Sequence, residues 1–146
     1  MDPFARKMIL GMVAFGSAFL LMAGALSVVY FHHRPRCGEA VVSEATSPDK
    51  QWTAAVMERR CGEESPFFVH VNLRPAAEPI RLSYFSGRAD QGEVFLAEQE
   101  SPDIAPELEW SSPTELTVRC SRCRAALVQK RDERWDRVEV RYQLGP

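Results

Sequence analysis

A long uncharged stretch near the N-terminus constrains this chain more than any other feature. Residues 8–31 read MILGMVAFGSAFLLMAGALSVVYF and contain no charged side chain. As an α-helix they would extend about 36 Å at about 1.5 Å per residue, which is enough to cross a bilayer. Side chains that favour the headgroup region flank the stretch, namely Arg6 and Lys7 before it and Tyr30, His32, His33 and Arg34 at its end. The pattern predicts a transmembrane helix over residues 8–31.

A cleaved secretory signal is the competing interpretation, since the small residues Ala23, Gly24 and Ala25 resemble a cleavage site. Cleavage there would leave the apolar residues 26–31 behind, and the apolar core of a signal is usually shorter, about 7–15 residues. We therefore expect the segment to be retained as an anchor. Small residues spaced by four within it also fit helix–helix packing, but such pairs arise easily in a segment rich in Ala and Gly, and we favour lipid contact as their explanation.

The cysteines indicate on which side of the membrane the rest of the chain lies. Basic residues flank the helix at both ends and do not settle the orientation. All four cysteines follow the helix, and an even number on one side is typical of an oxidising compartment. The sequence predicts residues 1–7 in the cytoplasm and a domain of residues 32–146 in the periplasm or outside the cell, anchored in the bacterial inner membrane. A cytoplasmic domain would instead require four free thiols.

Residues 32–146 have the pattern of a small β domain. Nine of the ten prolines lie there, and residues 67–74 alternate apolar and polar side chains as a strand with one buried face does. We expect a mainly β fold, an antiparallel sandwich or open barrel wired by adjacent hairpins. The predicted strands cover residues 51–59, 67–74, 80–85, 93–98, 107–110, 115–120, 125–130 and 138–144.

Charge is unevenly distributed along this domain. Every charged side chain in residues 90–115 is acidic, whereas basic side chains outnumber acidic ones in residues 119–141. One explanation is that neighbouring strands carry opposite charges that pair across the sheet. The other is a surface that orients a charged partner. The candidate partner surface comprises Asp90, Glu93, Glu98, Glu100, Asp103, Glu107, Arg119, Arg122 and Arg124.

Several function classes find no support in the sequence. The net charge of −2 gives no reason to expect nucleic-acid binding. His70 lies opposite the apolar face of its strand, which predicts a solvent-facing side chain rather than a general base. No nucleophile elbow, phosphate loop or metalloprotease motif occurs, and the carboxylates of residues 90–115 suggest at most a weak divalent-cation site. We predict a non-enzyme without cofactor or bound metal.

An ordered series of short motifs resembles a known group of proteins. It includes Cys37, the turn of residues 47–50 before Trp52, the residues 60–62 (RCG), Trp110 and a closing VEVRY. The set is similar to a family of small membrane- or lipid-anchored bacterial envelope proteins of unknown function, with the pattern C…SPDGK…CGATT…F…VF…W…L.I.Y…V.V.Y. Lys50 replaces the usual glycine, and residues 63–65 replace Ala-Thr-Thr. The resemblance implies an envelope location and no particular activity.

Four cysteines allow three disulfide pairings. The resemblance implies Cys37 with Cys61, which correspond to the two cysteines of the family, and leaves Cys120 with Cys123 as an addition of this chain. We expect the CSRC motif at residues 120–123 to be a structural bridge in a turn between strands. We do not expect zinc binding, because the sequence has no second CxxC or HxxxH pair to complete a site with Cys120 and Cys123.

The arginines around the CSRC motif would favour a thiolate, which leaves open a second function. The main prediction is a membrane-anchored, non-enzymatic binding or accessory protein of the bacterial envelope, in contact with the bilayer through residues 8–31 and with a membrane protein complex as partner. The alternative is a membrane-tethered thiol–disulfide oxidoreductase or disulfide carrier that uses Cys120 and Cys123.

Overall fold

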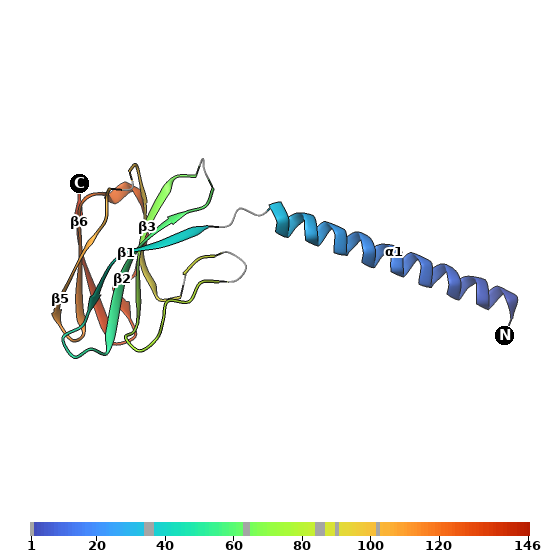
Figure 1. Cartoon of the computed structure of the whole chain (residues 1–146), viewed down its shortest axis with the longest axis horizontal. Helices are drawn as coiled ribbons and strands as arrows, with labels where there is room; N and C mark the ends of the chain where they lie inside the picture. The colour runs from blue at the N-terminus through green and yellow to red at the C-terminus, as the bar shows by residue number, and fades with distance from the viewer. Residues whose placement is uncertain (1, 34–36, 63–64, 84–86, 90, 102) are drawn as a thin grey trace. The chain divides into compact units, whose positions relative to one another are not determined.

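The computed structural model contains an N-terminal helix and a β domain, which separate into two compact units, residues 1–34 and 35–146 (Figure 1). The structure describes residues 2–33, 37–62, 65–83, 87–89, 91–101 and 103–146.

The helix α1 runs over Pro3–His33 and contains the whole uncharged stretch. Within Arg6–His32 the most apolar window of 18 residues has a mean hydropathy of 2.1, and none of it is buried against protein. Ser17 and Ser27 donate their hydroxyl hydrogen bonds to the carbonyls of Ala14 and Ala23 one turn earlier. These polar side chains are therefore satisfied within the helix, as an apolar surrounding requires. A membrane anchor and a signal sequence share this length and composition.

The β domain consists of two sheets, and the first has five antiparallel strands. Their spatial order is β1-β2-β3-β4-β7, so that only β7 comes from a distant part of the chain. We call this sheet A. Its strands are β1 (Gly38–Thr46), β2 (Trp52–Arg60), β3 (Phe67–Pro75), β4 (Glu93–Gln99) and β7 (Val128–Arg131).

The second sheet, sheet B, has four strands in the order β5-β6-β9-β8. Strands β6 and β9 are parallel, whereas the other neighbours are antiparallel. Between β6 and β9 the chain makes the short 3₁₀ helix η1 (Ala125–Leu127) and crosses to sheet A as β7. The strands are β5 (Glu107–Ser112), β6 (Glu115–Arg124), β8 (Arg134–Trp135) and β9 (Val138–Gly145).

The main hydrophobic core lies between the two sheets, as in a β-sandwich. Alternate residues of β2, β3 and β4 pack against alternate residues of β6 and β9, with Val71, Phe95, Leu116 and Val138 wholly buried. Tyr142 of β9 joins the sheets, because its ring stacks on Phe95 and its hydroxyl donates to carbonyls at the end of sheet A. Burial raises the pKa of this phenol, which keeps it a neutral donor.

A second, smaller apolar cluster covers the other face of sheet A. Ala55 and Met57 of β2 are buried there against Ala89 and the partly buried Ile80. Ala89 and Ile80 belong to the connection between β3 and β4, and we call its described residues, namely 76–83, 87–89, 91 and 92, the covering segment. The amide of Asn72 holds this segment by donating to the carbonyls of Ala89 and Gln91, at 2.8 and 2.9 Å.

Two glycines allow the covering segment to approach the sheet closely. Gly92 has φ +74° and would place a Cβ 2.0 Å from the carbonyl oxygen of Leu73. Gly87 has φ +68° and would place one 2.6 Å from the carbonyl oxygen of Cys37. Any larger residue would be strained and would displace the backbone at these positions. The segment is therefore fitted to the start of β1 and to β3.

The predicted fold class is confirmed, and two separate sheets favour the sandwich over the open barrel. Strand β1 was missed, and residues 80–83 are not the predicted strand, with residues 84–85 outside the described residues. Of the expected strand over 125–130, the first three residues form η1. The expectation of adjacent hairpins is wrong for β7, which pairs with β4, and for β9, which pairs with β6.

Candidate functional site: a buried ion cluster

Four adjacent strands of sheet A each place one ionisable side chain on the face under the covering segment. They are Glu39 of β1, Arg59 of β2, His70 of β3 and Glu93 of β4. We call these four residues the ion cluster. Glu39 is directly opposite Arg59 in the strand register, whereas His70 is opposite Met57 and thus lies diagonally from Arg59. The register therefore brings the four side chains together.

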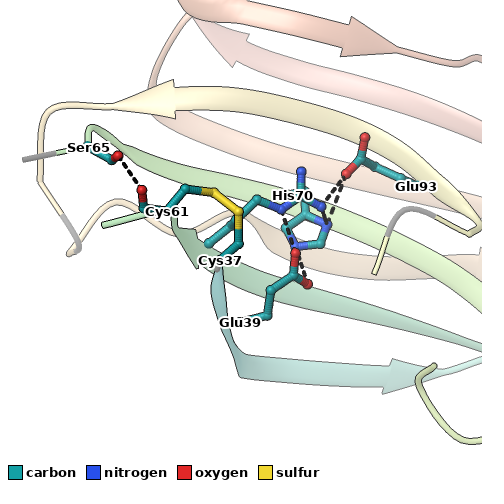
Figure 2. The surroundings of a disulfide bond; sticks show 7 residues. Cys37, Glu39, Cys61, Ser65, His70 and Glu93 are labelled. Atoms are coloured by element: carbon teal, nitrogen blue, oxygen red, sulfur yellow. Dashed lines mark hydrogen bonds and ion pairs between the residues drawn. A yellow bond between two sulfur atoms is a disulfide. The ribbon is translucent and has the colours of Figure 1, made fainter. Parts of the chain in front are cut away.

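Both carboxylates lie between the same two cationic groups. Arg59 donates from Nε to Oε1 of Glu39 at 2.5 Å and from Nη2 to Oε2 of Glu93 at 2.8 Å. The two ring nitrogens of His70 point to different carboxylates, Nε2 to Oε2 of Glu39 at 3.2 Å and Nδ1 to Oε2 of Glu93 at 3.3 Å. Figure 2 shows the His70 ring between Glu39 and Glu93. An imidazolium donates from both nitrogens, whereas a neutral ring donates from only one.

The cluster is almost completely removed from solvent. The side chains of Glu39 and His70 are fully buried, and those of Arg59 and Glu93 are 3% and 7% exposed. Burial would lower the pKa of His70, but the hydrogen bonds with Glu39 and Glu93 outweigh it and raise that pKa above its ordinary value. Burial likewise opposes ionisation of both glutamates, yet His70 and Arg59 hold their pKa values below the ordinary range. Two cations then balance two anions.

The Cys37–Cys61 disulfide closes the end of the hairpin next to the cluster. Gly38 and Arg60 form the outermost pair of β1 and β2, with Cys37 directly before Gly38 and Cys61 directly after Arg60. Each cysteine is thus two residues from a member of the Glu39–Arg59 pair. Figure 2 shows the disulfide together with Glu39 and His70. The bridge therefore joins the two strand ends next to this buried ion pair.

The sequence prediction for His70 was confirmed for the face of the strand on which it lies and wrong for its exposure to solvent. The alternation with Val69 and Val71 correctly placed it on the face opposite the main core. The expectation that this face meets solvent was wrong, because the covering segment buries it. Glu93 was likewise assigned to a partner surface and is instead buried in the ion cluster. The sequence signal for such a cover is limited to the apolar residues Ile80 and Ala89, which pack on this face of the sheet.

The Cys120–Cys123 disulfide is present, as is the Cys37–Cys61 bridge that the resemblance implied. Its predicted position in a turn between strands is wrong, because both cysteines lie within β6. Pairing with β9 shifts between Cys120 and Arg124, so that the bridge spans an irregularity of the strand. Cys120 is 4% exposed and Cys123 is fully buried, with the Gln99 amide donating to its sulfur at 3.2 Å.

The remaining residues of the predicted partner surface lie in three places. Glu107 and Arg119 are cross-strand partners on the outer face of sheet B, where Arg119 bonds Glu109 at 2.6 Å. Arg124 pairs with Glu100 at 2.9 Å, and Arg122 donates to the backbone carbonyl of Asp103. Glu98 is half-buried on β4, and Asp90 lies outside the described residues.

The charge segregation along the sequence thus leads in part to pairing between neighbouring strands, as the Arg119–Glu109 and Arg141–Glu115 pairs demonstrate. Within the part of the chain that the structure describes, no group of three or more His, Cys, Asp or Glu side chains is arranged to hold a metal ion. Glu93, one member of the suggested weak cation site, is engaged by Arg59 and His70.

No family model, no curated protein and no solved structure matches this chain. The function of the chain is therefore inferred from the chemistry of its own residues. An ion cluster of this composition has neither an open approach for a substrate nor a free nucleophile. Its geometry serves instead to tie β1, the covering segment and the sheet together.

Proposed function

We propose that this chain is a membrane-anchored, non-enzymatic binding or accessory protein of the bacterial envelope. The observation that carries the proposal is an exposed apolar helix, long enough to cross a bilayer, followed in one chain by a β domain with two disulfides. On this proposal the helix is retained in the inner membrane, the N-terminus is cytoplasmic and the sandwich is periplasmic. The resemblance to small anchored envelope proteins supports the same location.

The outer face of sheet B is the surface that we propose for a partner. The outer face of sheet A is occupied by the covering segment, whereas that of sheet B presents an exposed array of both signs. We call this array the β6 face and define it as Glu107, Glu109, Arg119, Glu139 and Arg141. Its internal ion pairs are solvent-exposed and contribute little, so that a charged partner can replace them with small loss.

Exchange chemistry at Cys120 and Cys123 is the weaker proposal. A thiolate must reach a disulfide sulfur along the axis of the bond, and both cysteines are buried. Their burial favours a structural role for this bridge. Turnover of a thiol or ester substrate by the purified full-length protein would contradict the proposal of a non-enzyme.

The location is tested with a membrane-impermeant thiol reagent on spheroplasts that express the full chain. We expect labelling of Cys37 and Cys61, which are half-buried, only after mild reduction and without permeabilisation. A variant with Cys37→Ala and Cys61→Ala is the control for labelling of the other pair. Labelling that needs permeabilisation but no reductant would show four cytoplasmic thiols and would overturn the proposed location.

The binding function is tested by the native mass of the full-length protein after gentle detergent extraction from its own membranes. We expect a discrete assembly with identified partner chains, lost when Arg119→Glu and Arg141→Glu are combined. Exchange of Lys50 and Arg81, exposed cations away from the β6 face, for glutamate is the matched control and should leave the assembly intact. A monomer or self-dimer for the unmodified chain would contradict an accessory role.

A further inference from the structure

The ion cluster lies where three parts of the domain meet, namely the start of β1, the strands β2 and β3, and the end of the covering segment. We call this junction the seam. Glu39 is two residues beyond Cys37, whose carbonyl oxygen meets Gly87 of the covering segment. Glu93 directly follows Gly92, the last residue of that segment. The two carboxylates therefore hold the start of β1 and the end of the covering segment, and His70 and Arg59 connect them. Loss of either carboxylate contact loosens one border of the seam.

One group in the cluster changes charge near neutral pH. With His70 protonated, two cations face two carboxylates, and each ring nitrogen lies within ion-pair distance of a carboxylate oxygen. With His70 neutral, one ring nitrogen becomes an acceptor, a role that Nδ1 can take toward Arg59 Nη2 at 3.5 Å, and the buried cluster then has a net charge of −1. An uncompensated buried charge is relieved most simply by admitting water. The covering segment is the element whose movement would do so.

We propose that the ion cluster is a pH-sensitive latch, which holds the covering segment on sheet A in mildly acidic conditions and releases it as the pH rises. The charged groups that face His70 are Glu39 from β1, Arg59 from β2 and Glu93 from β4. The covering segment contributes the neighbouring charge of Arg88, next to the buried Ala89. Release would uncover Ala55 and Met57, the apolar floor beneath the segment.

The direction of the pH effect follows from the pKa shifts. The raised pKa of His70 stabilises the closed seam fully below the ordinary value of 6.5, and this contribution is lost as the pH rises through the folded-state pKa. The lowered pKa values of Glu39 and Glu93 contribute above their ordinary value of 4.5 and lose that contribution in stronger acid. The latch is thus strongest between pH 4.5 and 6.5.

The experiment is hydrogen–deuterium exchange of the full-length protein in detergent, at pH 6.0 and 8.5 after correction for intrinsic exchange. Peptides from β6 and β9 serve as an internal reference for global unfolding. We expect peptides of the covering segment and of residues 37–46 to open at least about threefold more often at pH 8.5 than at pH 6.0. Each unit by which folding raises the pKa of His70 corresponds to up to about tenfold in this ratio. His70→Gln should abolish this difference, whereas His32→Gln should leave it unchanged.

Equal protection at the two pH values in the unmodified chain would overturn the proposal. So would a pH difference that persists in His70→Gln. If that variant does not fold, the NMR titration of His70 in the unmodified chain decides, with assignment by His32→Gln and His33→Gln. A His70 pKa above 6.5 supports the latch, and a value at or below 6.5 contradicts it. Neither measurement depends on the proposed location or partner.

Discussion

Replacing Arg59 with methionine is expected to lower the free energy of unfolding of the β domain by about 3–5 kcal/mol at pH 7. The substitution keeps most of the side-chain volume but leaves Glu39 and Glu93 with His70 as their shared cation. A buried carboxylate that has lost its cation is far less stable than a carboxylate in water. Removing one partner of a buried ion pair therefore lowers the stability of the protein by more than the intact pair contributes to it.

The three tryptophans allow a direct measurement, because all of them lie in the β domain and none in the helix. Denaturant titration of the full-length protein in detergent, followed by tryptophan fluorescence, therefore reports the unfolding of the sandwich alone. Arg74→Met is the matched control, since Arg74 pairs with a more exposed glutamate, Glu44, at 2.7 Å. We expect the control to change the stability by at most about 1 kcal/mol.

The effect of Arg59→Met should also depend on pH in a defined direction. The lowered pKa values of Glu39 and Glu93 mean that their ionised forms stabilise the unmodified domain above pH 4.5 and stop doing so in stronger acid. In the variant, the carboxyls protonate more readily, and the destabilisation at pH 4 should be smaller than that at pH 7. An equal loss at both pH values would indicate lost packing instead of lost charge pairing.

The sequence predicted those parts of the fold that have a local signature. Residues 67–74 alternate clearly because one face meets the main core, and the helix has a long uninterrupted apolar run. Strand β1 was missed because it is an edge strand exposed along most of its length, and its pairing shifts between Val41 and Ser43. An edge strand with a bulge has no regular alternation to detect.

The ion cluster could not be predicted because its parts are distant in the sequence. Glu39 and Arg59 meet through the β1–β2 register, and Glu93 joins them across β3. Alternation predicted only the face on which His70 lies. Whether that face meets water depends on the covering segment, which has no regular secondary structure of its own in residues 79–83. The burial of these charges is thus a tertiary property.

The Cys37–Cys61 bridge provides the second large expected effect. Combining Cys37→Ala with Cys61→Ala should lower the free energy of unfolding by about 3 kcal/mol, because the bridge closes a loop with a sequence separation of 24. The Cys120–Cys123 bridge has a separation of only 3, so that removing it releases less chain entropy, about 2 kcal/mol, in addition to the loss of buried sulfur contacts.

The two bridges are distinguished best by their coupling to the ion cluster. Glu39 and Arg59 each lie two residues from a cysteine of the first bridge, whereas Cys120 and Cys123 lie in the main core on sheet B. Combining Arg59→Met with loss of the first bridge should therefore deviate from additivity by at least about 0.5 kcal/mol. Combining it with loss of the second should be additive within about 0.5 kcal/mol. Equal coupling to both bridges would mean that the Cys37–Cys61 disulfide does not hold the buried ion pair in place. The effect of this disulfide on stability would then arise in the unfolded chain alone.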